Sequence, residues 1–266
     1  MSETYISLEQ QGAVATVWLE RPEVHNAFNA DLIRQLKDCF VALNQRDDVR
    51  VVVLAGRGKS FSAGADLNWM KAAGAASEAE NQADAQNLAD MLYALATLKQ
   101  PTIARVQGAA MGGGMGLAAT CDICIAGDKA MFATSEVRLG LAPSTISPYV
   151  IRAIGERQAQ RYFLTAERIS AAKAAEIGLA HEVVATEALD AKVEEIVAAL
   201  LLGGPVAQQA SKQLIALVAK RDNSAELRTQ TAAHIASVRA GQEAKEGLNA
   251  FLEKRAAAWC NSANPT

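Results

Sequence analysis

Three consecutive glycines, Gly112 to Gly114, are the feature that most restricts what this chain can fold into and do. They precede an apolar run that can begin a helix, so their unhindered backbone N–H groups point at whatever lies in front of that helix. A carboxylate, Glu136, follows a short strand-like stretch further along. N–H donors beside a carboxylate indicate acid/base chemistry next to a stabilised oxyanion. The stretch 108–136 is therefore the predicted centre of the site.

A second loop of small residues, FSAGADL at positions 61–67, follows a strand-like run of valines. It places amides at a tight turn, while the glycine run places amides at a helix N-terminus, where the helix dipole also favours negative charge. Two converging N–H donors form an oxyanion hole, which suits a thioester carbonyl that carries enolate charge during proton transfer. Losing one such donor costs about 10²–10³ in rate, and a positioned acid/base contributes about 10²–10⁴.

The order of the predicted elements indicates an α/β fold. A hairpin is expected over 5–9 and 13–19, a helix after the N-cap Asn29, and a mobile lid or a loosely ordered helix start over 68–77. Buried or short strands are expected over 50–54, 102–106, 122–126 and 131–133, with a helix over 78–98. The chain is expected to be almost wholly helical from Gly155 on, with helices over 155–165, 170–177, 187–202, 205–220, 224–239 and 242–257.

Composition limits the partners. The 266 residues are half hydrophobic, which suffices for one large core or a core with a small appendage. A net charge of −3 from well-mixed residues argues against nucleic acid or an anionic membrane as partner. No signal segment or membrane span is expected, so the predicted location is cytoplasmic. Cys121 and Cys124 form a C-x-x-C without a second pair, so buried thiols are expected and no metal.

Four ordered motifs carry a resemblance to a known family: FSAGADL, VQGAAMGGGMGLAATCDICIA, SEVRLGLAP and NAFLEKR. Together they resemble the crotonase, or enoyl-CoA hydratase/isomerase, superfamily from the first hairpin to the last helix. The resemblance implies a crotonase-like β-β-α spiral core over 1–200 and a C-terminal helical trimerisation region over 201–266. It also implies an acyl-CoA thioester substrate, no separate cofactor, and a homotrimer or a dimer of trimers.

The resemblance assigns residues. It implies that the Ala65 and Gly113 amides form the oxyanion hole and that Glu136 is the general acid/base. The residues implied to bind CoA are His25, Ala27, Ala63, Asp66 and Leu67, joined by Phe251 and Lys254 from a neighbouring subunit. Closing its own turn is a simpler interpretation of Asp66 than a catalytic role. Trp69 and Met70 are expected to line the acyl pocket, or only to pack the lid.

One departure from the family pattern concerns Gly116. In the best-known hydratases a second glutamate stands twenty residues before the first, so this chain lacks that carboxylate. Finer motifs, GADLNWMK and SEVRLGLAPSTISPYVIRAIGE among them, resemble bacterial methylglutaconyl-CoA hydratases of leucine breakdown and their isohexenyl relatives. The implied reaction adds water to 3-methylglutaconyl-CoA, with Glu136 handling the proton at C2. A double-bond isomerase is the alternative, because one glutamate can move a proton between two carbons.

Further alternatives stay open. Arg138 would share a face with Glu136 if this stretch were extended, and would then pair with a distal substrate carboxylate, although a surface arginine is commoner. Asp84, Glu78 and Glu80 are candidates to replace the missing carboxylate, or simply a solvated helix face. Gly114-x-Gly116-x-x-Ala119 formally matches a dinucleotide fingerprint, but its helix is too short for the usual crossover. The acidic balance argues against an RNA-binding or scaffolding protein.

Overall fold

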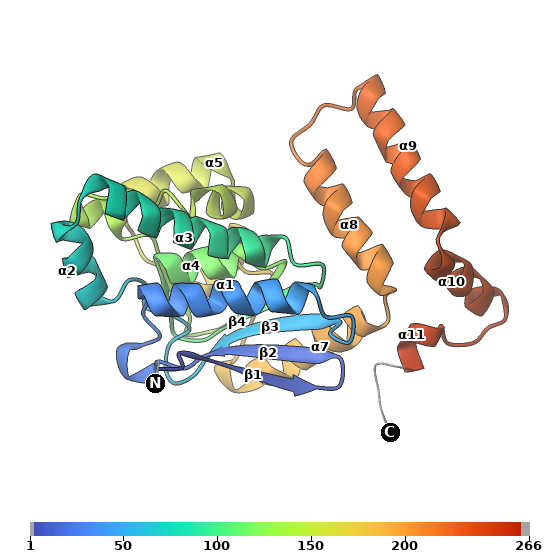
Figure 1. Cartoon of the computed structure of the whole chain (residues 1–266), viewed down its shortest axis with the longest axis horizontal. Coiled ribbons are helices and arrows are strands. Elements are labelled where there is room, and N and C mark those ends of the chain that lie inside the picture. Colours follow the sequence, from blue (N-terminus) through green and yellow to red (C-terminus); the bar gives the residue numbers. More distant parts are fainter. Residues whose placement is uncertain (1–2, 262–266) are drawn as a thin grey trace.

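The computed structural model describes residues 3–261 and is built on a six-stranded sheet in the order β1-β2-β3-β4-β6-β9 (Figure 1). The hairpin pair is antiparallel and every other pair in this sheet is parallel. The strand bounds are β1 Ile6–Gln11, β2 Val14–Leu19, β3 Val51–Gly56, β4 Thr102–Val106, β6 Ile123–Gly127 and β9 Glu182–Val184. The predicted hairpin and α/β fold are thus confirmed.

A second, smaller sheet pairs β5 (Ala109–Met111), β7 (Met131–Ala133) and β8 (Ile169–Ser170). An isolated parallel bridge between Ser62 and Ala110 extends this pairing to the loop after β3. The chain therefore repeatedly passes through the large sheet, then the small sheet, then a helix. This order is the β-β-α spiral that the resemblance implied.

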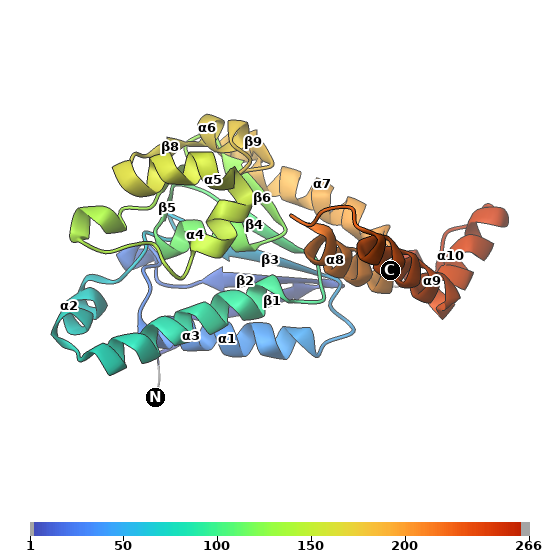
Figure 2. The same ribbon diagram turned by 90° about the horizontal axis from the view of Figure 1, so that it is seen from above.

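The valine run of β3 is apolar throughout because helices cover both faces of the large sheet. Val52 and Leu54 belong to the core shared with α1 (Ala30–Asn44) and α3 (Glu78–Ala96). Val51 and Val53 instead pack in a second cluster with Leu189 of α7 (Leu189–Leu201). Figure 2 shows α1 and α3 side by side on one side of the strands.

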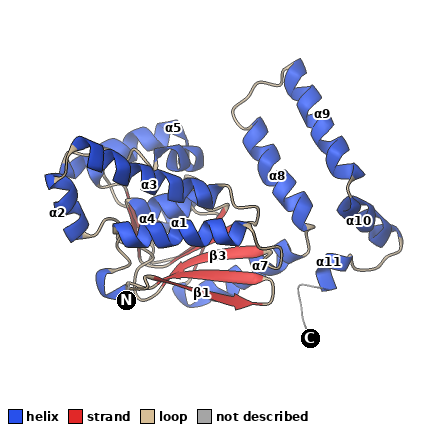
Figure 3. Ribbon diagram, in the orientation of Figure 1, coloured by secondary structure: helices blue, strands red, loops and turns tan. Residues whose placement is uncertain are grey.

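The remaining helices differ in how far they contact this core. Those around it are η1 Pro22–Val24, α2 Leu67–Ala75, α4 Gly113–Thr120, η2 Glu136–Leu139, α5 Ser147–Thr165, α6 Ala171–Glu176 and η3 Thr186–Ala188. The last four are α8 Pro205–Val218, α9 Ala225–Ala240, α10 Gln242–Leu252 and α11 Ala258–Asn261. Helices α8, α9 and α10 stand away from the sheets (Figure 3), and α8 buries none of its residues. No described helix is long and apolar enough to span a membrane.

Several predicted elements were wrong in detail. Residues 68–77 form mostly regular helix, because Asp66 caps α2 by accepting hydrogen bonds from the Asn68 and Trp69 amides. Helix α5 spans Ser147–Thr165 with a kink at Gly155, where φ is 75° and ψ is 160°. The helix predicted over 155–165 corresponds to the part after this kink, and the part from Ser147 to the kink was not predicted. The last long helix ends at Leu252, well before residue 257. Strands β8 and β9 interrupt the segment expected to be wholly helical, and at two or three residues they are too short to show a pattern.

Candidate active site

The loop that carries Ala65 is held by a short parallel bridge to Phe28. The Phe28 N–H donates to the Gly64 carbonyl at 2.7 Å, and the Asp66 N–H donates to the Phe28 carbonyl at 2.8 Å. Because both flanking groups turn toward Phe28, the N–H of Ala65 itself points to the opposite edge. Among the described residues no acceptor lies within hydrogen-bond reach of this N–H. It is a free backbone donor on an exposed loop.

The glycine run places a second donor at the start of α4. Gly112, with φ 49°, ends the small-sheet strand and donates its N–H to the Ala133 carbonyl at 2.8 Å. Gly113 is the first residue of α4, where an N–H has no partner within the helix. A Cβ placed on Gly113 would lie only 2.3 Å from Phe28 Cε2, so the residue must be glycine for the backbone to run here.

Two backbone hydrogen bonds bring these loops side by side. The Ser62 N–H donates to the Ala109 carbonyl at 3.0 Å, and the Met111 N–H donates to the Ser62 carbonyl at 2.9 Å. A Cβ on Gly64 would lie 3.0 Å from the Met111 carbonyl oxygen. The structure therefore juxtaposes the segments of Ala65 and Gly113, although they are far apart in sequence.

Glu136 stands at the start of η2 and turns its carboxylate toward the glycine run. Its Oε1 lies 3.2 Å from the position that a Cβ on Gly112 would take. Its Oε2 is buried and has no hydrogen-bond partner among the described residues. Burial raises the pKa of this carboxyl above its ordinary value, since desolvation penalises the charged form. An unpaired, desolvated carboxyl beside backbone donors suits proton transfer.

The position of Gly116 is closed by a neighbouring side chain. A Cβ on Gly116 would lie 2.3 Å from Ile146 Cγ2, and Ile146 is itself buried just before α5. A carboxylate side chain at 116 has no room unless Ile146 moves. Two of the carboxylates considered as replacements for the missing glutamate have structural partners. Glu80 belongs to the capping box of α3 with Ser77, and Asp84 accepts a hydrogen bond from Trp69.

The residues predicted to bind CoA in the same chain lie around one loop cluster. His25 has the left-handed φ of 54°, its carbonyl accepts from the Ala63 N–H at 2.9 Å, and its Nδ1 lies 3.1 Å from Ser60 Oγ. His25, Ala63 and Leu67 are exposed, whereas Ala27 and Asp66 are buried. Only the three exposed residues are accessible to a ligand, whereas Ala27 and Asp66 are covered by protein atoms.

Phe251 and Lys254 lie at the end of α10 and just after it, both exposed. Helix α10 stands on the opposite side of the molecule from α2 in Figure 1. Within one chain these two residues are therefore not brought to the loops of the site.

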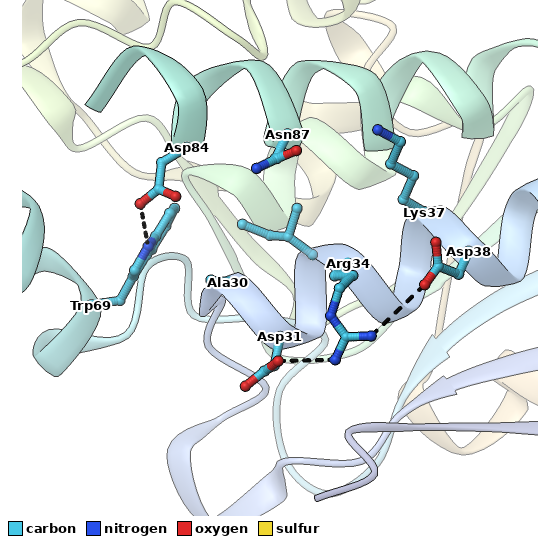
Figure 4. Close-up of a pocket in the computed structure, with 9 residues that line it drawn as sticks. Ala30, Asp31, Arg34, Lys37, Asp38, Trp69, Asp84 and Asn87 are labelled. Atoms are coloured by element: carbon cyan, nitrogen blue, oxygen red, sulfur yellow. Dashed lines mark hydrogen bonds and ion pairs between the residues drawn. The ribbon is translucent and has the colours of Figure 1, made fainter. Parts of the chain in front are cut away.

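Trp69 and Met70 lie on α2, both half-buried. Trp69 donates from Nε1 to Asp84 Oδ2 at 3.2 Å and borders a cavity of about 280 Å³ between α1 and α3 (Figure 4). Arg34 in this cavity pairs with Asp31 at 3.0 Å and Asp38 at 3.8 Å. The tryptophan thus ties α2 to α3.

The premise for Arg138 was wrong. The stretch from Glu136 is a 3-10 helix, not an extended strand, so residues two apart point in different directions. Arg138 is exposed in the single chain, whereas the Glu136 carboxylate faces inward.

Sequence reasoning missed Arg21 and Asn26, which are both buried. The Arg21 guanidinium pairs with Asp66 at 3.0 Å, and the Asn26 side chain accepts from the Arg21 N–H at 2.9 Å. An arginine before a proline ordinarily reads as an exposed loop residue. The one available signal was Asp66, a carboxylate in an apolar loop that calls for a cation.

Two other chemistries find no support in the geometry. Gly114 packs against the Ser62 carbonyl and Gly116 against Ile146, so the glycines of the apparent dinucleotide fingerprint face protein atoms and not a ligand. Cys121 and Cys124 are buried free thiols, and burial raises the pKa of Cys124 to about 12. Residues 3–261 contain no group of three potential metal ligands.

Comparison with known proteins points to one family. A family model described as enoyl-CoA hydratase/isomerase matches residues 9–262. A crotonyl-CoA hydratase from Syntrophomonas wolfei is 34% identical over 259 residues, covering 97% of this chain and 98% of the relative. A short-chain-enoyl-CoA hydratase from Clostridium acetobutylicum is 33% identical over 256 residues, covering 94% and 95%. The solved structure of an enoyl-CoA hydratase from Shewanella pealeana matches with a TM-score of 0.94 at 40% identity, covering 96% of each chain.

Proposed function

Because the chain belongs to the enoyl-CoA hydratase/isomerase family, we propose that it adds water across the conjugated double bond of a 2-enoyl-CoA. One observation carries the proposal above all. The Glu136 carboxyl has a raised pKa and a buried oxygen without a hydrogen-bond partner among the described residues, and it adjoins the glycine run, whose first helical amide has no partner within α4. A proton-transfer group thus lies beside a backbone donor.

In the proposed reaction the thioester oxygen accepts hydrogen bonds from the Ala65 and Gly113 N–H groups. These donors stabilise the enolate charge that develops on this oxygen as the water oxygen bonds to C3. Glu136 takes one proton from the attacking water and delivers a proton to C2, so the sum of the steps is the addition of one water molecule. No separate cofactor takes part, since CoA enters as part of the substrate.

For the acyl group we propose 3-methylglutaconyl-CoA, which hydration converts to 3-hydroxy-3-methylglutaryl-CoA in leucine breakdown. The support is the motif resemblance around Trp69 and Arg138. Isohexenylglutaconyl-CoA is the alternative substrate of the same chemical class.

A second candidate reaction, movement of the double bond, is favoured by Gly116. Ile146 fills the space where a second carboxylate would stand, so no second group at that position holds a water molecule. One acid/base suffices to remove a proton from one carbon and return it to another.

A turnover panel separates these reactions. The purified protein is incubated with 3-methylglutaconyl-CoA, crotonyl-CoA and a 3-enoyl-CoA, and the product masses are followed. A gain of one water on the first substrate, faster than on the second, supports the proposal. A shifted double bond without a mass change on the third, with no hydration of the others, supports the isomerase.

We also propose that the active unit is a homotrimer or a dimer of trimers. Helices α8 to α10 leave large apolar side chains exposed in the single chain, Ile215, Ile235, Leu248 and Phe251 among them. Such a surface is expected to be covered by other subunits. In this arrangement Phe251 and Lys254 reach the CoA site of a neighbouring subunit.

A further inference from the structure

Arg21 is a buried cation that joins the segment of Ala27 and Phe28 to the segment of Ala65 and Asp66. It is 8% exposed, and its guanidinium donates through one nitrogen to the Ala27 carbonyl and through the other to Asp66 Oδ2 at 3.0 Å. The guanidinium carbon lies 4.7 Å from the centre of the Tyr5 ring. Both of its acceptors are one residue from the bridge between Phe28 and Ala65.

This placement matters because the Ala65 N–H is aimed by the backbone alone. Ala27 precedes Phe28 and Asp66 follows Ala65, so Arg21 spans the bridge from one strand to the other. The other carboxylate oxygen of Asp66 accepts the Asn68 N–H at 2.9 Å and starts α2. One arginine therefore fixes the separation of the two segments and the point at which the loop turns into helix.

The backbone before Phe28 needs such support. His25 and Asn26 both have left-handed φ values, 54° and 55°, which non-glycine residues adopt only at a cost. The buried Asn26 side chain holds this turn by accepting from the Arg21 N–H and donating to the Arg57 and Ser60 carbonyls at 2.9 Å. The backbone and side chain of Arg21 thus connect the strained turn to the loop of Ala65.

We propose that Arg21 is a positioning residue for the oxyanion hole: through the Ala27 carbonyl and Asp66 it sets the direction of the Ala65 N–H. The inference rests on the proposed function, since it takes this N–H to receive the thioester oxygen. Arg21 itself touches neither substrate nor reacting atoms. Its loss alters how strongly the carbonyl is polarised more than how tightly CoA is held.

The test compares Arg21→Met with Arg21→Lys and Asp66→Asn. Arg21→Met removes both contacts, whereas lysine offers one nitrogen in place of the two-pronged guanidinium. Asp66→Asn keeps a good N-cap but removes the ion pair. The matched control is Arg105→Met, which removes another largely buried arginine that pairs with Asp190 on the α7 side of the sheet. Thermal melts establish that each variant is folded.

The kinetic expectation follows from misdirecting one donor. For Arg21→Met we expect kcat to fall about 10- to 100-fold, with KM changed less than about threefold. Arg21→Lys should recover part of the loss, and Arg105→Met should retain wild-type kcat. Because the arginine and the carboxylate act as one unit, the Arg21→Met, Asp66→Asn double variant should lose no more than the worse single variant. If the kcat losses of the two single variants multiply in the double variant, or if Arg21→Met changes only KM, the proposal is overturned.

A spectroscopic measurement keeps this test independent of turnover. Cinnamoyl-CoA, a conjugated thioester, should absorb at longer wavelength when its carbonyl accepts two N–H groups in the site. The shift should shrink in folded Arg21→Met and Asp66→Asn and stay intact in Arg105→Met. A full shift in folded Arg21→Met refutes the positioning role. If the wild type hydrates no acyl-CoA in the panel, the proposed reaction fails, yet this shift still decides whether Arg21 positions the donor. If Arg21→Met does not fold, the absorption shift in Asp66→Asn decides the question in its place.

Discussion

At the scale of single residues, the buried carboxyl of Glu136 lowers the stability of the fold, and the proposed proton transfer explains why it is there. Its carboxyl is desolvated and one oxygen has no partner among the described residues, so the ionised form is disfavoured in the folded state. A structural carboxylate would be paired instead, as Asp66 is with Arg21. The residue is thus better explained by proton transfer than by stability.

This cost gives a pH-dependent prediction for Glu136→Gln. The folded-state pKa lies above the ordinary value of 4.5, so ionisation favours the unfolded chain as pH rises through the raised pKa. The variant, which never ionises, should gain melting temperature relative to wild type at pH 8 and gain least near pH 4. Turnover should fall by about 10²–10⁴. Paired melts across this range check the sign, and a constant difference between the two proteins contradicts it.

The roles of small residues were predictable, whereas the buried arginine was not. Ala65 and Gly113 are proposed to act through their backbones, and local sequence shows where small residues let a backbone approach a ligand. Arg21 and Asp66 meet across 45 positions only because two loops fold together. A single sequence shows the carboxylate in the loop but does not show which cation pairs with it.

At the scale of elements, the start of α4 is defined by packing against Phe28. Gly113 has no space for a side chain, whereas Gly74 in α2 has no atom within 4 Å of its Cβ position. These two helical glycines therefore form a matched pair.

We expect Gly113→Ala to force α4 away from Phe28, with a loss of about 1–3 kcal/mol of stability and a fall in kcat. Gly74→Ala should raise stability by about 0.5–1 kcal/mol, because it removes backbone freedom without a clash. Thermal melts at equal protein concentration, together with kcat, give both values. Equal behaviour of the two variants would show that the contact with Phe28 does not restrict the site.

Element predictions succeeded where a long apolar pattern existed and failed where tertiary contacts decide. The helix after Asn29 and the valine strand were found from periodicity and composition. The sequence did not determine the backbone conformation at Glu136, because three or four residues cannot reveal a 3-10 helix. Helix α2 was underestimated, because its stability comes from the Asp66 cap and the Trp69–Asp84 hydrogen bond and not from an apolar face.

At the scale of the whole molecule, the C-terminal helices give a test of whether the site is shared. Phe251 is 81% exposed in one chain, so Phe251→Ala should leave the fold of the single subunit nearly unchanged while raising KM for the acyl-CoA. Mixed with Glu136→Gln subunits, it should form sites with an intact Glu136 from one chain and an intact Phe251 from the next. Activity at low substrate should then exceed that of the unmixed variants combined. No gain after verified subunit exchange contradicts a shared site.

The same architecture bears on how such a catalyst changes over time. The donors at Ala65 and Gly113 are main-chain groups, and the bonds from Ser62 and Met111 that bring their loops together are main-chain bonds. Only proline deletes a backbone N–H, so any other substitution at these positions leaves the donor in place and acts by shifting it, as Gly113→Ala is expected to do. Side chains that line the acyl group under the proposed function, Trp69 among them, have no such constraint. A lineage with this fold can therefore exchange one acyl substrate for another while it keeps the same main-chain donors.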